Sequence, residues 1–297
     1  MRQLLLIFSL ITVLFLSCEK SGGGQGQPVV IGDSRDLIKP AVCRTKVVAH
    51  RGGSAEAGSI NNPDNSLAAL RYAMGLGCYA SECDIYITAD DNVVVAHAND
   101  EYKINGCIPW ESTLAQIRAG GKLTNGEDIP CLEDFLRVVV DASNCTKLWL
   151  DIKATTSVDT RYAIAAAQRA CEIIKDFDSA KNFCEFICTG NGPTMASAFQ
   201  YARGVGVPIG WMGAHDATYY KSKYYDWCNM PISYLEQAGG PYTIAEFVNA
   251  GIELSVFNAD TDAEMEWYVA RAADMKAICT NYPKKLIDKF KSAGNPG

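Results

Sequence analysis

The sequence predicts an α/β protein of the (β/α)8 TIM-barrel class. From Lys46 onward, eight short apolar runs alternate with longer helical patterns, and this alternation over about 250 residues is typical of such a barrel. Hydrophobic residues make up 48% of the 297 residues, which is enough for one large core. No sequence repeat or internal linker divides this stretch, so we expect residues 46–297 to form a single domain. An open doubly wound sheet is the alternative, because sequence alone does not show whether the sheet closes.

Each predicted strand is a short apolar run, and each predicted helix has apolar residues at helical spacing. The strands are 46–50, 79–87, 147–153, 183–189, 207–212, 231–235, 252–257 and 276–280, and the helical patterns include 65–77, 132–142, 159–177, 243–251 and 261–273. Thr243 and Thr261 are of the residue type that caps helix N-termini. Gly75, Gly77 and Gly251 are of the type that ends helices.

The N-terminus has the pattern of an export signal. Arg2 precedes an apolar run that ends at Ser17 and Cys18, so residues 1–18 resemble a bacterial lipoprotein signal in which Cys18 is lipidated. A plain signal peptide or a short membrane anchor is the alternative. Residues 19–45 are rich in Gly, Gln and Ser at their start and predict a flexible tether and lead-in. We therefore expect an exported lipoprotein, anchored to a membrane at its periplasmic face or at the cell surface.

Charge and cysteine content narrow the function further. The net charge of -7 argues against nucleic acid as a partner, since phosphate backbones need a basic face. An anionic substrate would therefore need local cations or a metal. Of the twelve cysteines, eleven remain once Cys18 is set aside. Export permits disulfides among them, but the odd number predicts at least one unpaired thiol, and the pairing does not follow from the sequence. The oligomeric state does not follow from the sequence.

Charged side chains gather at the ends of the first three predicted strands. His50 and Arg51 end the first, and Glu82 and Asp84 share one face of the second. The third strand carries Asp151 and Lys153 on one face, and the carboxyl ends of barrel strands meet at one rim. Carboxylates so placed repel one another, which a divalent cation such as Mg²⁺ or Ca²⁺ would relieve. A protonated or ion-paired carboxylate, such as an internal Asp–Lys pair, is the alternative.

His97 is placed by the register of a predicted hairpin. If residues 84–97 turn between Asp90 and Asp91, residues whose numbers sum to 181 face each other, which sets His97 opposite Asp84. A slip of one residue would turn His97 away. Two histidines beside a cation site suit phosphodiester cleavage, one taking a proton from the nucleophile and the other giving one to the leaving alkoxide. His215, the remaining histidine, is assigned to a loop.

These motifs, in this order, resemble the glycerophosphodiester phosphodiesterase family. The matching stretches are His50-Arg51-Gly52, Pro63-Asp64-Asn65-Ser66, Glu82-x-Asp84, 93-VVVAH-97, 129-IPCLEDFL-136, 150-LDIK-153 and 278-ICTNYP-283, spread over residues 46–286. Each is short, but together they form a strong signal. The resemblance implies a TIM barrel with an insertion after the second strand and hydrolysis to an alcohol and glycerol 3-phosphate. Attack by a neighbouring substrate hydroxyl, through a cyclic phosphate, is left open.

The resemblance also implies roles for individual residues. The divalent cation would be held by Glu82, Asp84 and Asp151, the acid/base pair would be His50 and His97, and the substrate phosphate would be bound by Arg51 and Lys153. The chain departs from the family pattern at several positions. Asp64 and Asp151 stand where Glu is usual, and Ala98 stands where an acid usually follows the second histidine. In the late TD-x-P pattern the Asp is replaced by Asn281, and Phe257 stands where a tryptophan is usual. These departures loosen the assignment of glycerol as the recognised moiety.

Two segments bear on the substrate. The first is a β-hairpin and loop insertion of about residues 86–128, whose part 98–128 would cap the barrel mouth. The second is residues 218–228, which hold five aromatic side chains. Those aromatics predict either a lip that faces lipid or sugar or simple loop packing. Two further functions therefore compete with a small-molecule phosphodiesterase. One is a phospholipase of C or D type acting on membrane lipid, and the other is a non-catalytic surface lipoprotein that binds phosphorylated polyols or glycans.

Overall fold

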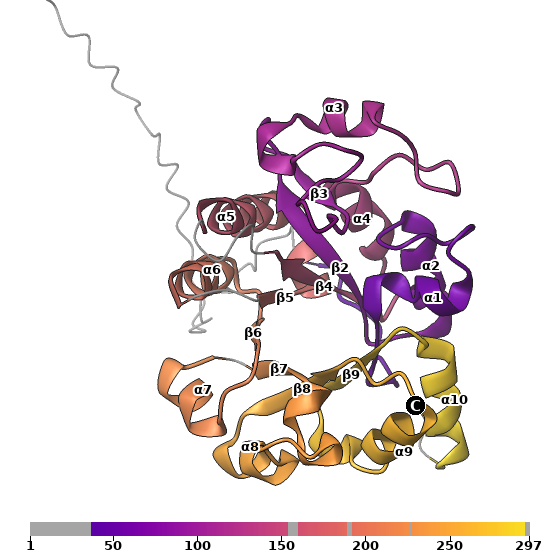
Figure 1. Ribbon diagram of the computed structural model, residues 1–297, viewed down its shortest axis with the longest axis vertical. Coiled ribbons are helices and arrows are strands. Elements are labelled where there is room, and N and C mark those ends of the chain that lie inside the picture. The colour runs from indigo at the N-terminus through magenta and orange to yellow at the C-terminus, as the bar shows by residue number, and fades with distance from the viewer. Residues whose placement is uncertain (1–36, 154–159, 189–191, 226, 295–297) are drawn as a thin grey trace, which may run out of the picture. The chain divides into compact units, whose positions relative to one another are not determined.

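The computed structural model describes residues 37–153, 160–188, 192–225 and 227–294 (Figure 1). The predicted signal with Cys18 and most of the tether lie outside these residues. The described lead-in runs along the barrel without regular secondary structure, and the backbone N–H of Ala41 donates to the carbonyl of Asn144 at 2.8 Å. Within the described ranges, helices are too short or too polar to span a lipid bilayer.

Eight parallel strands form a closed barrel, which excludes the doubly wound alternative. They are β1 (Val47–Ala49), β2 (Ala80–Ile87), β4 (Lys147–Ile152), β5 (Cys184–Cys188), β6 (Ile209–Met212), β7 (Trp227–Pro231), β8 (Glu253–Phe257) and β9 (Ala277–Thr280). Each strand pairs with the next, and β1 closes the ring by pairing with both β2 and β9. The short β3 (Val93–Val95) lies outside the ring, antiparallel to β2.

Helices surround the barrel on its outer face (Figure 1). They are α1 (Ser54–Ala57), α2 (Leu67–Leu76), α3 (Leu114–Ala119), α4 (Leu132–Val139), α5 (Arg161–Asp176), α6 (Gly192–Val205), α7 (Ala217–Lys223), α8 (Ile244–Ala250), α9 (Asp262–Val269) and α10 (Pro283–Ser292). Short 3-10 turns are η2 (His50–Gly52), η3 (Pro109–Glu111), η4 (Ala180–Phe183), η5 (Ile232–Tyr234), η6 (Glu236–Ala238) and η7 (Ala272–Asp274). Thr243 and Thr261 cap α8 and α9 as predicted, each within a capping box. Gly77 and Gly251 end their helices, whereas Gly75 lies inside α2.

The predicted strand 231–235 is wrong, because β7 begins four residues earlier. Trp227 and Met230 are buried inside the fold, whereas Tyr234 is 45% exposed in a 3-10 turn. Ile232 and Leu235 pack against the core from a 3-10 turn and the residue after it, so these apolar residues mimic a strand in sequence. The aromatic segment 218–228 is likewise not a loop, since α7 and the start of β7 take up most of it.

Large side chains fill the barrel. Val48, Ala80, Trp149, Ile187, Met212, Trp227, Ala277 and Cys279 form one buried cluster inside the ring. The rings of Trp149 and Trp227 lie 4.6 Å apart, centroid to centroid. A Cβ on Gly210 would lie 2.5 Å from the Trp227 ring, so a residue without a side chain is needed there to seat the indole. A much larger apolar core lies between the ring and its helices.

The segment between β2 and β4 adds a hairpin, α3 and α4 to the barrel. Tyr86, Val94, Ala96, Ile104, Leu114, Ile117 and Ile129 form a separate buried cluster under it. The hairpin register pairs Ile85 with Val95 and Ile87 with Val93, so the paired numbers sum to 180 rather than 181. Three residues form the loop, with Asp91 in the left-handed region (φ 66°). Thr88 accepts from the Asn92 N–H at 2.9 Å and fixes this longer turn.

The cysteines of the described chain are free thiols, so no disulfide joins the residues in these ranges. Seven of the eleven are buried, and burial raises the pKa of thiols such as Cys83 and Cys279 far above the ordinary value. These side chains behave as small apolar core residues.

Candidate active site

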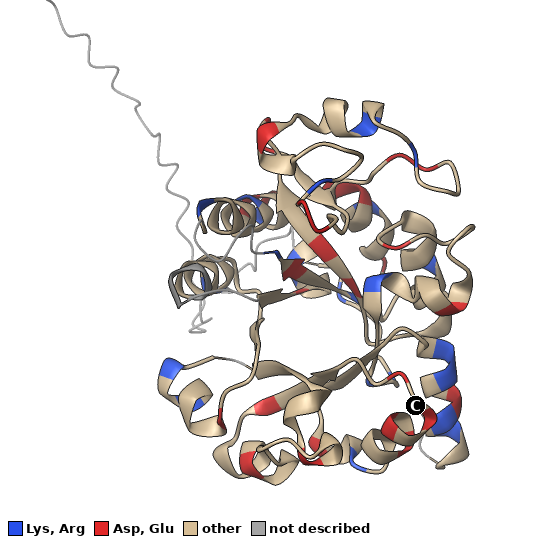
Figure 2. Ribbon diagram, viewed as in Figure 1, with Lys and Arg blue, Asp and Glu red and all other residues tan. Residues whose placement is uncertain are grey.

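Three carboxylates meet at the carboxyl ends of β2 and β4, as predicted. Glu82, Asp84 and Asp151 are 3%, 0% and 2% exposed, and each offers an oxygen within 4.8 Å of the others. The parallel register sets Asp84 directly beside Asp151. Figure 2 shows acidic residues on both ribbons. Three acids this close and this buried form an all-oxygen donor set, which suits Mg²⁺ or Ca²⁺.

The described protein groups do not fully balance these acids. Burial, together with Asp84 and Asp151, raises the pKa of Glu82 well above the ordinary value. Burial also raises the pKa of Asp151 to about 6, against the opposing effect of Lys153. Asp151 Oδ1 is buried and has no hydrogen-bond partner among the described residues. A buried acceptor without a donor and carboxyls that resist ionisation both fit a site for a divalent cation.

Two basic side chains lie on the acid cluster. Lys153 Nζ is 2.8 Å from Asp84 Oδ1 and 2.5 Å from Asp151 Oδ2, so the Asp–Lys pair considered from sequence is present. Arg51 places Nε 3.3 Å from Asp84 Oδ2 and Nη1 3.2 Å from Asp64 Oδ2. Burial alone would raise the pKa of Asp84, but Lys153 and Arg51 lower it. Both cations keep about a fifth of their side-chain surface exposed, so they can also reach an anion at the rim.

The turn after β1 depends on its glycines. Arg51, Gly52 and Gly53 all have positive φ, at 49°, 83° and 79°. A Cβ on Gly52 would lie 2.6 Å from Cβ of Ala69 in α2, so only glycine allows this approach. The turn directs the backbone N–H of Arg51 to Glu82 Oε2 at 2.9 Å. One short motif thus positions a histidine, a guanidinium and a backbone donor together.

His50 lies at this rim beside Asn281, Asn258 and Glu82. Its Nδ1 is 2.7 Å from Asn281 Oδ1, and its Nε2 is 3.8 Å from Glu82 Oε2. Burial lowers the pKa of His50 below the ordinary value, although the bond to Asn281 opposes the shift. At neutral pH the ring is therefore uncharged and able to accept a proton.

His97 reaches the site by a route that the sequence did not predict. The register puts Ala96, not His97, opposite Asp84, and the Ala96 N–H donates to the Asp84 carbonyl at 3.1 Å. The chain leaves strand geometry after Val95, and His97 becomes exposed in a cavity of about 460 Å³ that Arg51 and Asp64 also line. Partial desolvation lowers the pKa of His97 below its ordinary value, and the charge of Asp84 opposes this shift. The predicted pairing is wrong, but the side chain still lies within electrostatic reach of the acid cluster.

Sequence reasoning missed a residue that positions Asp84. Asn65 donates from Nδ2 to Asp84 Oδ2 at 2.8 Å and accepts from the Asp84 N–H at 3.0 Å. It is buried and has a positive φ of 58°, which asparagine tolerates better than most residues. Its place in the Pro63-Asp64-Asn65-Ser66 motif was the available signal, but nothing in sequence tells which polar side chain of a loop turns inward.

Several aromatic side chains of the two rim segments pack against the protein, whereas Tyr224 is 78% exposed. Trp110 stacks on Tyr162 of α5 at 5.2 Å, so the segment after β3 rests on the barrel helices. His215 stacks on Tyr219 at 3.9 Å, and the Trp211 ring contacts both of them edge-on. His215 belongs to this aromatic cluster, in agreement with its assignment to a loop.

A second buried acid lies at the opposite end of the barrel. Glu185 of β5 accepts from the Tyr79 hydroxyl at 2.7 Å, from Lys147 at 2.6 Å and from the Trp149 indole N–H at 3.0 Å. Lys276 adds an ion pair at 3.4 Å. Burial alone would raise the pKa of Glu185, but Lys276 and Lys147 lower it overall. This acid is fully compensated by the protein itself.

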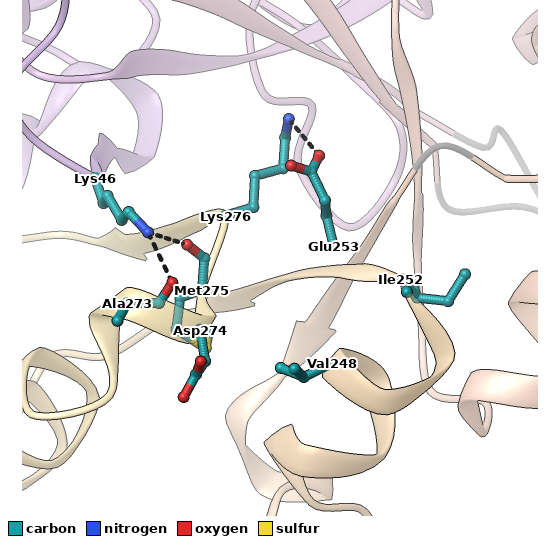
Figure 3. A pocket seen from close by; sticks show the side chains of 9 residues that line it. Lys46, Val248, Ile252, Glu253, Ala273, Asp274, Met275 and Lys276 are labelled. Carbon is teal, nitrogen blue, oxygen red and sulfur yellow. Dashed lines mark hydrogen bonds and ion pairs between the residues drawn. The ribbon is translucent and has the colours of Figure 1, made fainter.

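A cavity of about 400 Å³ lies at this end, beside the start of β8 and β9 (Figure 3). Lys46 and Lys276, the two cations of its lining, are already paired. Lys46 donates to the carbonyls of Ala272 and Met275, both at 2.6 Å. Its bond to Met275 and the pair of Lys276 with Glu253, 3.3 Å apart, are drawn in Figure 3. Both lysines are thus used within the protein, which is the pattern of a structural network.

The closed parallel barrel carries at its carboxyl rim a buried acid cluster that could hold a divalent cation, with a histidine and two cationic side chains beside it, and this defines a TIM-barrel protein. The chain belongs to the glycerophosphoryl diester phosphodiesterase family, whose model matches residues 50–285. That match includes every predicted site residue of the barrel.

Individual relatives agree with this membership. A glycerophosphodiester phosphodiesterase of Caldanaerobacter subterraneus subsp. tengcongensis is 35% identical over 106 residues, which cover 33% of this chain and only 42% of that relative. The crystal structure of a glycerophosphodiester phosphodiesterase from Parabacteroides distasonis superposes with a TM-score of 0.70 at 21% identity, covering 86% of this chain and 100% of that one. An Oleispira antarctica phosphodiesterase, solved in complex with the product sn-glycerol-3-phosphate, has a TM-score of 0.63 at 17% identity over 83% of this chain and 96% of its own. These structures share the fold.

Proposed function

We propose that this protein hydrolyses glycerophosphodiesters to an alcohol and glycerol 3-phosphate. The buried trio of Glu82, Asp84 and Asp151 beside a neutral His50 is the observation that carries the proposal. Membership of the family supports it, and so does the product complex of the Oleispira antarctica relative. The reaction replaces the P–O bond to the alcohol by a P–O bond to water, and one proton passes to the leaving oxygen.

The three carboxylates would hold a divalent cation. Such a cation supplies charge stabilisation at the phosphoryl oxygens and positions the substrate. Arg51 and Lys153 neutralise the same acids in the described structure. Both can turn outward to bind substrate phosphate, Arg51 through its planar fork and Lys153 as a point charge.

The two histidines would move the protons. His50 is half-buried and uncharged, so it suits the role of the base that accepts a proton from the nucleophile. His97 lies in the wall of the cavity of about 460 Å³, where the leaving alcohol would have room, and it would donate a proton to that oxygen. Attack by a neighbouring hydroxyl of the substrate would use the same groups and yield a cyclic phosphate first.

A panel of diesters tests this function. Purified protein is incubated with glycerophosphocholine, glycerophosphoethanolamine, glycerophosphoglycerol and phospholipid vesicles, with Mg²⁺, Ca²⁺ or chelator, and the released alcohol is identified. We expect release of the alcohol from soluble diesters that stops with chelator and is abolished in His50→Ala. Release of headgroup from vesicles alone would instead favour a phospholipase, and binding without cleavage would favour a non-catalytic lipoprotein.

The role of His97 is tested separately, because its predicted register was wrong. We expect His97→Ala to abolish turnover of diesters with ordinary alkoxide leaving groups and to retain the fold by circular dichroism. A diester with a nitrophenol leaving group needs no proton donor, so the variant should regain turnover on it. Full activity of His97→Ala on both substrates would overturn the acid/base pair.

We also propose that the chain is exported and tethered to a membrane through lipid on Cys18, on the sequence pattern of residues 1–18 alone. Radiolabelled palmitate should be incorporated into the wild-type protein and not into Cys18→Ser. Equal distribution of both proteins between membrane and soluble fractions would contradict the tether.

A further inference from the structure

Asn281 binds the catalytic candidate His50 and is itself held by an acid that the proposed reaction does not use. Asn281 follows β9, and its Nδ2 donates to Asp260 Oδ2 at 2.6 Å. The other end of its amide, Oδ1, is 2.7 Å from His50 Nδ1. A chain of contacts therefore runs from Asp260 through Asn281 to the imidazole.

The orientation of the Asn281 amide follows from its surroundings. Asp260 Oδ1 already accepts from the backbone N–H of Asn281 at 2.8 Å and from the Thr280 hydroxyl at 2.9 Å. Thr280 is the donor in that bond, because a carboxylate oxygen only accepts, and the Thr280 oxygen accepts in turn from the Tyr282 N–H at 3.0 Å. Asp260 is thus an acceptor only, so Asn281 has to turn its NH₂ group toward Asp260 and its oxygen toward His50.

An oxygen at 2.7 Å from Nδ1 requires that Nδ1 carry the hydrogen. We infer that Asp260 and Asn281 are positioning residues that fix the tautomer of His50, with the proton on Nδ1 and the lone pair of Nε2 facing the acid cluster. A base needs this form, since a proton on Nε2 would block the atom that faces the site.

Two other neighbours favour the opposite tautomer, but both are weaker. Asn258 Nδ2 is 3.4 Å from His50 Nδ1, and Asn258 Oδ1 is buried without a partner among the described residues, so that amide is not fixed as Asn281 is. Glu82 Oε2 would accept a proton from Nε2, but at 3.8 Å it lies beyond hydrogen-bond distance. The short bond to Asn281 decides the tautomer.

The same hydrogen-bond geometry predicts a substitution that reverses the tautomer of His50. In Asp260→Asn, the amide oxygen stays with the backbone N–H of Asn281, because that donor cannot turn. The new NH₂ group then faces the Asn281 NH₂ group, which forces the Asn281 amide to rotate and to present a donor to His50 Nδ1. Nδ1 must then accept, and the proton moves to Nε2.

The tautomer is read by nuclear magnetic resonance on protein labelled with ¹⁵N-histidine. Only three histidines contribute signals, and loss of one set in His50→Gln assigns His50. Long-range ¹H–¹⁵N correlations at pH 8 show which ring nitrogen is protonated. We expect Nδ1–H in the wild type and Nε2–H in Asp260→Asn.

A double exchange and a surface control complete the test. In Asp260→Asn with Asn281→Asp, the carboxylate introduced at position 281 accepts from both His50 and the amide introduced at position 260, so Nδ1–H should return. Asp262→Asn makes the same change two residues away on the surface, where Asp262 pairs with Lys285 and Lys289, and should leave the tautomer unchanged. A wild-type protein with Nε2–H, or an Asp260→Asn variant that keeps Nδ1–H, would overturn the inference.

Kinetics give a second readout, which rests on the proposed function. We expect kcat to fall roughly 10²-fold or more in Asp260→Asn, with KM changed only a few-fold, and to recover partly in the double exchange. If no diester is cleaved by the wild type, the proposed function fails while the tautomer measurement still decides this inference. Should Asp260→Asn fail to fold, the wild-type tautomer alone can overturn it.

Discussion

At the carboxyl end of the barrel, Glu82 and Asp151 are buried with raised pKa values, whereas at the amino end Glu185 is equally buried with a lowered one. The difference lies in the partners. Glu185 has hydrogen bonds from three side chains and ion pairs with two lysines, while Asp151 keeps one oxygen without a partner among the described residues. The protein thus compensates the buried charge fully at one end of the barrel and only in part at the other.

Between the two clusters lies a layer of indoles. Trp149 pairs in register with Glu82 on one side and with Glu185 on the other, and its indole N–H points to Glu185. Trp149 and Trp227 together fill the middle of the ring. The layer separates the two charged clusters, so each can be altered with little effect on the other.

The largest expected effect is the loss of activity in Glu82→Gln. The amide keeps an acceptor for the Arg51 N–H but removes a charge from the cation site, so kcat should fall roughly 10³-fold and calorimetric binding of Mg²⁺ or Ca²⁺ should weaken. Without cation, the free energy of unfolding should stay equal or rise, because a buried acid with a raised pKa is removed. A large loss of stability with retained cation binding would contradict the comparison.

At the amino end of the barrel, removal of the buried acid should lower stability and leave activity nearly unchanged. Glu185→Gln leaves Lys147 and Lys276 without their buried counter-charge, and we expect the free energy of unfolding in urea to fall by about 3 kcal/mol. At a temperature where the variant is folded, kcat should stay within a few-fold of the wild type. The matched control is Glu253→Gln, whose side chain is 63% exposed and also pairs with Lys276, and it should change stability by less than about 0.5 kcal/mol.

A loss of stability of intermediate size is expected when the layer of indoles formed by Trp149 and Trp227 is disturbed. Gly210→Ala places a Cβ 2.5 Å from the Trp227 ring and should destabilise the protein by about 1–3 kcal/mol. Gly204→Ala, in α6, meets nothing within 4 Å and should be neutral or slightly stabilising. Equal melting temperatures of the two variants would show that the layer is loosely packed.

The smallest expected effect is the change in stability at acidic pH. The pKa of Glu185 is lowered in the folded state, so its contribution to stability is present above the ordinary value of 4.5 and is lost as the pH falls through the folded value. The stability difference between the wild type and Glu185→Gln in urea should therefore shrink between pH 7 and about pH 3. A difference that grows on acidification would mean that the sign of the pKa shift is wrong.

The sequence predicted the barrel because its strands are local apolar runs and its helices have local capping signals. Every predicted strand except 231–235 coincides with an observed one, and Glu82, Asp84 and Asp151 converge because period-two alternation fixes their faces. The prediction of a strand at 231–235 failed because apolar residues that pack on the core from a 3-10 turn look like a strand in sequence. Only the burial of Trp227 and Met230 distinguishes the real β7.

Other features depend on geometry that local sequence does not carry. The hairpin register missed by one residue because Thr88 and Asp91 make a three-residue loop, and a period-two pattern alone does not fix loop length. The Glu185 network was missed because its members come from separate strand starts far apart in the chain. The orientation of Asn281 depends on Asp260, 21 residues earlier in the chain, and on which of its atoms donate.

The contrast between the carboxyl and amino ends of the barrel is tested most directly by two measurements on Glu82→Gln and Glu185→Gln: kcat on a glycerophosphodiester and the free energy of unfolding. We expect Glu82→Gln to be inactive and stable, whereas Glu185→Gln should be active and destabilised. Loss of turnover in Glu185→Gln while it is folded, together with full turnover in Glu82→Gln, would contradict the assignment of the reaction to the carboxyl end of the barrel.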